Sequence, residues 1–114
     1  MDSCLFCKII KGDIPCSKVY EDEYVLCFKD INPVCKVHVL VIPKLHIKDL
    51  NEVSENNIKY LNSIMLNIPK IARSLDIEKD GYRVISNTGV NGGQEVPHLH
   101  FHILGGEKLG SKIV

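Results

Sequence analysis

The sequence has no excess of charge of either sign, because 14 basic side chains balance 14 acidic ones among its 114 residues. Proteins that bind a nucleic-acid backbone concentrate Lys and Arg, so this balance argues against nucleic acid as a partner. No apolar run approaches the roughly 20 residues of a membrane-spanning helix, so we expect no membrane partner either. Internal repeats and low-complexity tracts are also missing, and we expect residues 1–114 to form a single domain.

The chain has five cysteines, an odd number that cannot all pair in disulfides. It also lacks the basic start and apolar core of an export signal. Both observations argue against a disulfide framework and favour thiols in a reducing compartment. We therefore expect a cytoplasmic protein. Cys16, Cys27 and Cys35 show no spacing typical of metal ligands, and we expect them to pack as small apolar side chains.

Short runs rich in apolar and β-branched residues are frequent along the chain. They predict strands over residues 18–20, 24–29, 37–42, 82–86 and 99–104. Most connections between these runs are too short for parallel crossovers. The pattern therefore predicts an α+β domain with a mainly antiparallel sheet of about five strands.

One long helix is predicted over residues 54–75, where apolar side chains recur at helical spacing and Ser54 is a suitable N-cap. Pro69 lies inside this segment and should kink the helix, because proline removes a backbone donor. Two shorter helices are the alternative interpretation. Residues 4–11 form too short a segment to assign, although Phe6 and Ile9 would share one helical face.

Three histidines, His98, His100 and His102, alternate with apolar residues. This is the period of a β-strand, so we expect the three imidazoles to project from one face. Either they bind a catalytic metal, or one is a nucleophile whose neighbours serve a phosphate and the leaving group. The glycine-rich residues 87–95 favour the nucleophile, because such a segment can turn backbone N–H groups towards an anion. For His38, the residues alone favour an ordinary packing role.

Cys4 and Cys7 form a C-x-x-C pair near the N-terminus. The pair is either a redox dithiol or half of a structural zinc site, and no thioredoxin-like βαβ pattern follows it. A zinc site needs two further ligands, and His46 and one of the three alternating histidines are candidates.

Together these motifs resemble the histidine triad (HIT) superfamily, whose signature is three histidines that alternate with apolar residues. The resemblance covers nearly the whole chain, including residues 6–10, 20–22, 28–33, 38–47, 81–83 and 92–94 besides the triad. The chain is most similar to the branch of nucleoside phosphoramidases known as Hint proteins. The resemblance implies a HIT-like α+β fold whose sheet is extended across a homodimer.

The resemblance also implies a reaction and roles for four catalytic histidines. His100 would attack the phosphorus of a purine nucleoside 5′-phosphoramidate, such as adenosine 5′-phosphoramidate, and form a covalent nucleotidyl-histidine. A backbone carbonyl near His98 would hold the other ring N–H of His100, His102 would contact the phosphoryl oxygens, and His38 would have a supporting role. The alternatives are a nucleotide-binding sensor or scaffold with incidental activity, a dinucleoside polyphosphate hydrolase, and a metallohydrolase that uses the triad as its metal site.

The nucleotide-binding residues implied by the resemblance fall into three groups. The apolar slot for the base would comprise Leu5, Phe6, Ile9, Phe28 and Ile31. Asp30 would accept hydrogen bonds from the ribose hydroxyls, and Asn87 would lie near the ribose and phosphate. Around the phosphate the implied residues are Gly93, Gln94, Glu95 and Val96. Glu95 departs from the family pattern, since several members have Ser or Thr there and a carboxylate repels phosphate.

Finally, the resemblance implies a structural zinc held by Cys4, Cys7, His46 and His98, and no organic cofactor. Four protein ligands close a zinc tetrahedron, so this ion would stabilise the site rather than activate water.

Overall fold

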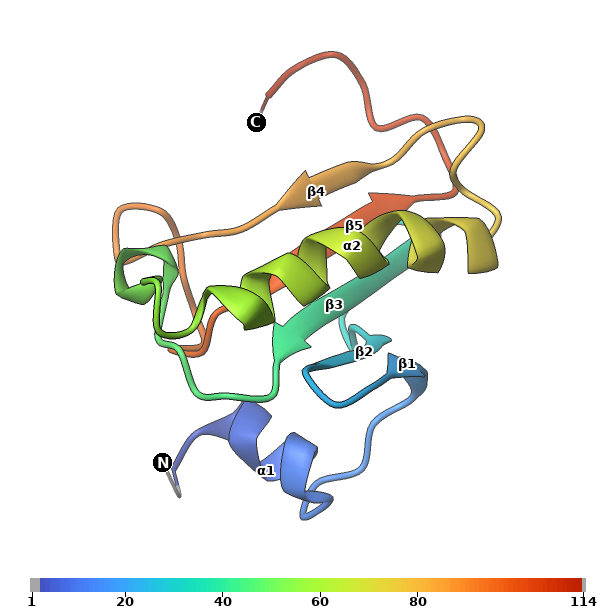
Figure 1. Ribbon diagram of the computed structural model, residues 1–114. Coiled ribbons are helices and arrows are strands. Elements are labelled where there is room, and N and C mark those ends of the chain that lie inside the picture. The colour runs from blue at the N-terminus through green and yellow to red at the C-terminus, as the bar shows by residue number, and fades with distance from the viewer. Residues whose placement is uncertain (1–2, 114) are drawn as a thin grey trace.

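The computed structural model describes residues 3–113 and places a five-stranded sheet between two helices (Figure 1). The elements are α1 (Leu5–Lys11), β1 (Lys18–Glu21), β2 (Val25–Lys29), β3 (Val37–Pro43), the 3₁₀ turn η1 (Leu50–Glu52), α2 (Ile58–Ser74), β4 (Arg83–Ile85) and β5 (Phe101–Gly105). The strand order is β1-β2-β3-β5-β4, and every neighbouring pair is antiparallel. The predicted α+β class with an antiparallel sheet is therefore confirmed.

The two faces of the sheet are covered by different helices. Alternate residues of β2, β3 and β5, among them Val25, Val39 and Ile103, pack with α2 in the larger core cluster. The intervening residues Leu26 and Leu40 form a smaller cluster with Phe6 of α1 and its neighbours. Because both faces are buried, β2 and β3 are apolar along most of their length instead of alternating.

The long helix begins later than the sequence predicts. α2 runs from Ile58 to Ser74, so Ser54 is not its N-cap; the Ser54 N–H instead donates to the side-chain oxygen of Asn57 in a preceding turn. The helix is continuous across Pro69, so the alternative of two helices is wrong. Pro69 and Met65, one turn earlier, are both exposed, and water can therefore bind the Met65 carbonyl that proline deprives of its helical donor.

The histidine segment also enters the sheet later than predicted. β5 begins at Phe101 and not at residue 99, so His102 alone of the triad lies within a strand. The reason is that the Leu99 N–H donates to the carbonyl of Ile47 at 2.6 Å, in the segment that follows β3. Leu99 and Phe101 are nevertheless buried in the core cluster under α2, so the predicted alternation of faces holds.

The segment over residues 4–11 is the short helix α1. Cys4 caps its N-terminus, since Cys4 Sγ accepts from the Cys7 N–H at 3.4 Å. Gly12 ends the helix with φ of 88°, a left-handed conformation that glycine adopts without strain. No helix among residues 3–113 is long and apolar enough to cross a membrane.

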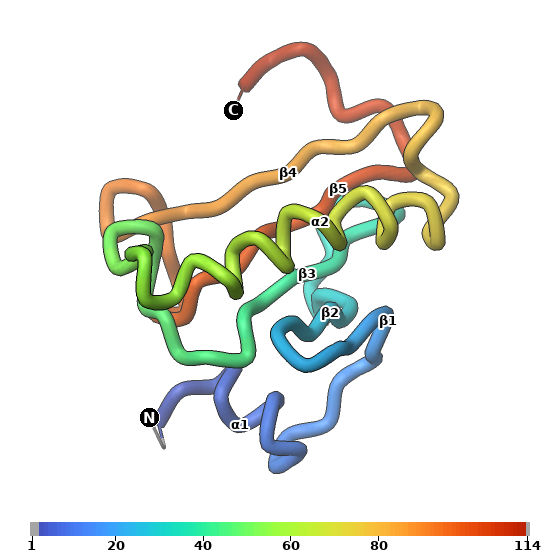
Figure 2. Tube along the Cα trace, in the orientation of Figure 1, coloured from blue at the N-terminus to red at the C-terminus, as the bar shows by residue number. Residues whose placement is uncertain are grey.

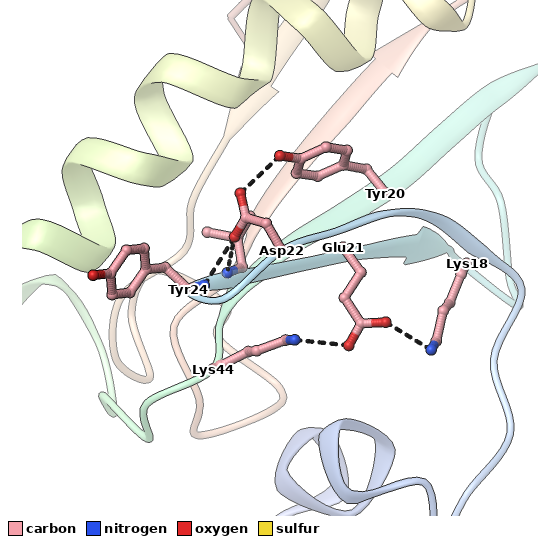
Figure 3. Close-up of polar contacts among 7 residues, drawn as sticks. Lys18, Tyr20, Glu21, Asp22, Tyr24 and Lys44 are labelled. Carbon is pink, nitrogen blue, oxygen red and sulfur yellow. Dashed lines mark hydrogen bonds and ion pairs between the residues drawn. The ribbon is translucent and has the colours of Figure 1, made fainter.

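The turn between β1 and β2 is organised by one half-buried carboxylate, that of Asp22 (Figure 3). Asp22 accepts from the Tyr20 hydroxyl at 2.7 Å and from the backbone N–H groups of Tyr24 and Val25 at 2.8 and 2.9 Å. It also accepts from the Asn67 amide of α2 at 3.2 Å, so this turn is attached to the long helix. Burial opposes the charge, but these hydrogen bonds hold the pKa of Asp22 below its ordinary value.

Candidate functional site

Three segments that are distant in sequence meet next to the end of β3: α1, residues 44–50, and residues 87–100 (Figure 2). The last two are joined by the bond from Leu99 to Ile47 and by the Gln94 amide, which donates to the Lys48 carbonyl at 2.8 Å. α1 contacts residues 44–50 through Cys7, whose side chain lies against that of His46. The meeting point thus collects cysteines and histidines from all three segments.

Cys4, Cys7, His46 and His98 direct one ligand atom each to a common point, and the four atoms lie within 4.8 Å of one another. Cys4 Sγ lies 3.3 Å from His98 Nδ1, and Cys7 Sγ lies 3.3 Å from His46 Nδ1. In a tetrahedral site with Zn–S of about 2.3 Å and Zn–N of about 2.0 Å, sulfur and nitrogen stand about 3.5 Å apart. The group therefore fits a closed, four-coordinate metal site in both spacing and donor chemistry.

The environment of His98 directs a lone pair towards the two cysteines. Its Nε2 donates to the Pro43 carbonyl at 2.9 Å, which leaves Nδ1 unprotonated in the neutral ring. Burial, with smaller contributions from His46 and His100, lowers the pKa of His98 to about 4 despite the bond to Pro43. His98 is therefore neutral at pH 7, as a metal ligand must be.

The thiol of Cys7 is held in its protonated form by the protein alone. Burial, together with the adjacent Cys4 side chain, raises the pKa of Cys7 to about 11. A bound cation reverses this balance, because it stabilises two thiolates that otherwise repel each other.

The three triad imidazoles do not share a metal position. Among the described residues, His98 belongs to the cluster with the cysteines and His102 to a separate cluster with Asp30 and His38. His100 belongs to neither cluster. The alternative of a catalytic metal bound by all three triad histidines is therefore wrong.

His100 has one hydrogen-bonded ring nitrogen and one free ring nitrogen. Its Nδ1 donates to the His98 carbonyl at 2.7 Å, and its ring packs edge-on against Phe6 with 5.2 Å between centroids. Its Nε2 has no partner among residues 3–113. Among residues 3–113, Thr88 Oγ1 is the one side-chain nitrogen or oxygen that has neither solvent contact nor a hydrogen-bond partner. His100 Nε2 has no partner and is not such an atom, so it is in contact with solvent. Nε2 is thus the open nitrogen of this ring.

His102 lies beside His100, with 5.1 Å between ring centroids, and also contacts His38. His38 Nε2 lies 2.9 Å from His102 Nδ1 and 3.3 Å from Asp30 Oδ2. Burial is the largest cause that lowers the pKa of both imidazoles, to about 4 for His102, although Asp30 opposes the shift in each. The ordinary packing role that the residues alone favoured for His38 does not account for these contacts.

The glycine-rich loop before the triad is closed by its own side chains. The Asn87 amide donates to the Gly92 carbonyl at 2.7 Å, and Gln94 Oε1 accepts from the Gly89 N–H at 2.9 Å. A Cβ at Gly92 would stand 2.3 Å from the Thr88 carbonyl oxygen, so the turn requires glycine there. Glu95 is exposed, which lets its carboxylate point into solvent.

The predicted base slot is only partly assembled. Phe6 and Phe28 are buried and meet edge to face at 5.6 Å, next to His100. Leu5 is 44% exposed and Ile31 is 91% exposed, and neither packs in the core cluster that holds this aromatic pair. A cavity of about 340 Å³ is lined by the end of α1, the segment that follows it and β1, and Ile9 is the one residue that it shares with the predicted slot.

Three backbone groups at the site were not predicted from the sequence. They are the Pro43 carbonyl that holds His98, the Lys48 carbonyl that holds Gln94, and the Val34 N–H, which donates to His38 Nδ1 at 3.2 Å. Every residue carries such groups, so no residue type marks them in a sequence.

Comparisons with known proteins agree with the fold. The HIT domain family matches residues 11–109. A purine nucleoside phosphoramidase of Escherichia coli is 43% identical over 109 residues, covering 96% of this chain and 92% of that protein. An uncharacterised HIT-like protein of Buchnera aphidicola is 49% identical over 105 residues, covering 92% of this chain and 94% of that protein.

A solved structure gives the same result. A HIT family hydrolase from Clostridium thermocellum is 49% identical and superposes with a TM-score of 0.97, covering 100% of this chain and 99% of that one.

Proposed function

The chain belongs to the HIT domain family, and we propose that it is a hydrolase of that family, which cleaves the P–N bond of purine nucleoside 5′-phosphoramidates. Adenosine 5′-phosphoramidate is the simplest such substrate. The observation that carries the proposal is the hydrogen bonding of His100: Nδ1 donates to the His98 carbonyl, and Nε2 has no protein partner among residues 3–113. This leaves Nε2 available as the nucleophile that we propose. The name of the E. coli relative supports the same substrate class.

The reaction proceeds in two displacements at phosphorus. The His100 Nε2 lone pair forms a bond to phosphorus while the P–N bond to the amine breaks, and the amine takes up one proton from solvent as it leaves. Water then attacks the phosphorus of the nucleotidyl-His100 and gives up one proton to solvent, the P–N bond to His100 breaks, and the nucleoside monophosphate is released. The His98 carbonyl stabilises the cationic imidazole in both transition states, because it accepts from the ring N–H.

His102 is the group that we assign to the phosphoryl oxygens. Its Nδ1 receives a hydrogen bond from His38, so its own proton resides on Nε2. The N–H groups of His98 and His100 are both held by carbonyls, whereas His102 Nε2 has no partner among the described residues. His102 is therefore the triad histidine that has a proton to donate to the ligand.

The remaining contacts of the nucleotide follow from the same placement. Asp30, at the end of β2 and within 3.3 Å of His38, is assigned to the ribose hydroxyls. Phe6, Phe28, Leu5, Ile9 and Ile31 are assigned to the base. Asn87 and the backbone of residues 93–96 are assigned to the ribose and phosphate. The exposed Glu95 is not assigned a phosphate contact, because its charge is repulsive.

For the cysteine–histidine group we propose Zn²⁺ in a structural role, bound by Cys4, Cys7, His46 and His98. Zn²⁺ supplies a closed tetrahedral cross-link when bound, and it matches two thiolates and two imidazoles better than Mg²⁺ or Ca²⁺ does. Its four ligands connect α1 to residue 46 and to the triad. It thus restrains the segment that holds the nucleophile.

We propose that the chain forms one HIT domain over residues 1–114 and that two copies assemble as a homodimer. We propose the cytoplasm as its location. β4 is an edge strand of the sheet, and Val84 within it is 40% exposed. An unpaired edge with an exposed apolar residue is suited to pairing with a second copy, which extends the sheet across a two-fold axis. Native mass spectrometry distinguishes this dimer from a monomer.

The decisive experiment traps the covalent intermediate. Wild-type protein mixed rapidly with adenosine 5′-phosphoramidate and quenched in base should carry one added AMP group on the peptide that contains His100. His100→Ala should abolish both the adduct and turnover while AMP still binds, and Glu55→Gln, which changes an exposed carboxylate before α2, serves as the matched control. Turnover by His100→Ala at the wild-type rate would refute the mechanism. AMP binding without turnover by the wild type would favour a sensor or scaffold.

A further inference from the structure

The residue that carries the proposed nucleophile lies just outside the sheet. The pairing of β4 with β5 reaches as far as Ile85 with His102. The same register, continued by two residues, would pair Asn87 with His100, but no backbone hydrogen bond joins these two among residues 3–113. The strand ladder therefore does not fix the main chain of His100.

A side-chain hydroxyl takes the place of the missing ladder bond. Ser86, the residue that follows β4, donates from Oγ to the His100 carbonyl at 3.0 Å. Ser86 is half-buried, and no other hydrogen bond reaches the main chain of His100 among the described residues. A serine hydroxyl has one proton, so this bond uses its whole donor capacity. Ser86 is thus the hydrogen-bond anchor of the His100 main chain.

The main chain on either side of His100 is anchored by other contacts. Before it, the Leu99 N–H donates to the Ile47 carbonyl at 2.6 Å. After it, the chain enters β5 at Phe101 and joins the ladder. The peptide group that contains the His100 carbonyl lies between these two anchors, so the Ser86 hydroxyl is the contact that limits its rotation.

The orientation of this peptide group matters for the imidazole, because both are attached to the Cα atom of His100. The ring is oriented about its own bonds by two contacts: Nδ1 donates to the His98 carbonyl at 2.7 Å, and Phe6 packs edge-on with 5.2 Å between centroids. Neither contact holds Cα. A displacement of about 1 Å at the reacting atoms can cost about 100-fold in rate, so a small movement of Cα is enough to misplace Nε2.

We propose that Ser86 is a positioning residue for the nucleophile: its hydroxyl fixes the main chain of His100 and so the point from which Nε2 attacks. The inference rests on the proposed function, in which His100 Nε2 attacks phosphorus. Ser86 acts through His100 and is assigned no contact with the nucleotide. Loss of its hydroxyl should therefore slow the chemical step and leave nucleotide binding intact, whereas a serine that only completes the end of β4 would affect stability alone.

The kinetic test measures the single-turnover rate of His100 nucleotidylation at saturating adenosine 5′-phosphoramidate, together with the Kd for AMP. Ser86→Ala should react about tenfold more slowly, with a Kd for AMP within about twofold of the wild-type value. Ser86→Thr keeps the hydroxyl and should recover most of the rate, and Ser111→Ala, at an exposed serine, is the matched control that should react as the wild type does. A wild-type rate in Ser86→Ala would overturn the inference. So would a rate in Ser86→Thr as low as that in Ser86→Ala, or a loss of AMP affinity in Ser86→Ala as large as its loss of rate.

A second measurement does not depend on turnover. With AMP bound, the ¹³C resonance of the His100 carbonyl and the ¹⁵N–¹H signal of its Nδ1 should shift in Ser86→Ala and return in Ser86→Thr. The Nε2–H signal of His98, whose ring is held by the Pro43 carbonyl, should stay unchanged. These shifts in a protein that does not hydrolyse phosphoramidates would refute the proposed reaction and support the anchoring of His100 by Ser86. Unchanged His100 signals in Ser86→Ala, when the wild type does hydrolyse phosphoramidates, would refute the role of Ser86 alone.

Discussion

Phe6 connects the stability of the fold to the geometry of His100, the proposed nucleophile, so its removal should affect both. The side chain is 4% exposed and packs edge-on against Phe28, His98 and His100, with 5.6, 5.8 and 5.2 Å between ring centroids. A buried Phe removes about 150–200 Å² from water, worth about 4 kcal/mol, and Phe→Ala substitutions in cores cost about 3–5 kcal/mol. Phe6→Ala should therefore remove about a quarter or more of a typical stability of about 5–15 kcal/mol.

The assay is urea unfolding at pH 7.5 with excess Zn²⁺, followed by circular dichroism. Phe6→Leu retains most of the volume and should lose about 1 kcal/mol, and Leu66→Ala, at a side chain 68% exposed on α2, should change stability by less than about 0.5 kcal/mol. Phe6→Ala should also slow nucleotidylation of His100 by about tenfold, because the ring that orients the imidazole is gone. A loss of stability below about 1 kcal/mol would mean that α1 is not packed against the sheet in solution.

Three further predictions concern the metal site, the pH dependence and the β1–β2 turn. Cys4→Ser should lower bound zinc from about one ion per chain to a small fraction, measured by elemental analysis of protein purified without chelator, and full occupancy would contradict the ligand assignment. His102 has a pKa lowered to about 4, mainly by burial and then by His100 and His38, so below pH 6.5 the unfolded chain binds a proton that the folded chain excludes. The free energy of unfolding should therefore be highest above pH 6.5 and should fall as the pH drops towards 4. His102→Gln should make the midpoint of urea unfolding less dependent on pH in this range. An unchanged pH dependence would exclude His102 as its cause. Asp22→Ala should lower the free energy of unfolding, measured in urea, by about 2–3 kcal/mol, because the carboxylate accepts hydrogen bonds from two backbone N–H groups, a hydroxyl and an amide. Tyr20→Phe removes one of these bonds and should lower it by about 1 kcal/mol. Equal losses in the two variants would contradict this account of the turn.

Local patterns in the sequence predicted most of the elements but not all of their ends. Leu99 and Phe101 alternate with the triad histidines, and this alternation predicted that they lie together on the opposite face, which packs under α2. The prediction holds because successive side chains of any extended chain point to opposite sides. The start of β5 depends on a carbonyl 52 positions away, that of Ile47, which binds the Leu99 N–H before the ladder begins. The sequence places the N-terminus of α2 too early because Ser54 and Asn57 are both good capping residues; in the structure the Asn57 side chain bonds to the Ser54 N–H and the Glu52 carbonyl, and this turn precedes the helix.

By itself, the sequence predicted that the chemistry resides on His98, His100 and His102 and that Cys4 and Cys7 form half of a ligand set, because residue type and spacing are local properties. The tertiary structure made the three histidines different. The Pro43 carbonyl fixes the proton of His98, the His98 carbonyl fixes that of His100, and His38 fixes that of His102. Which nitrogen keeps its lone pair depends on what the other nitrogen binds, and those partners are set only when distant segments of the chain fold together.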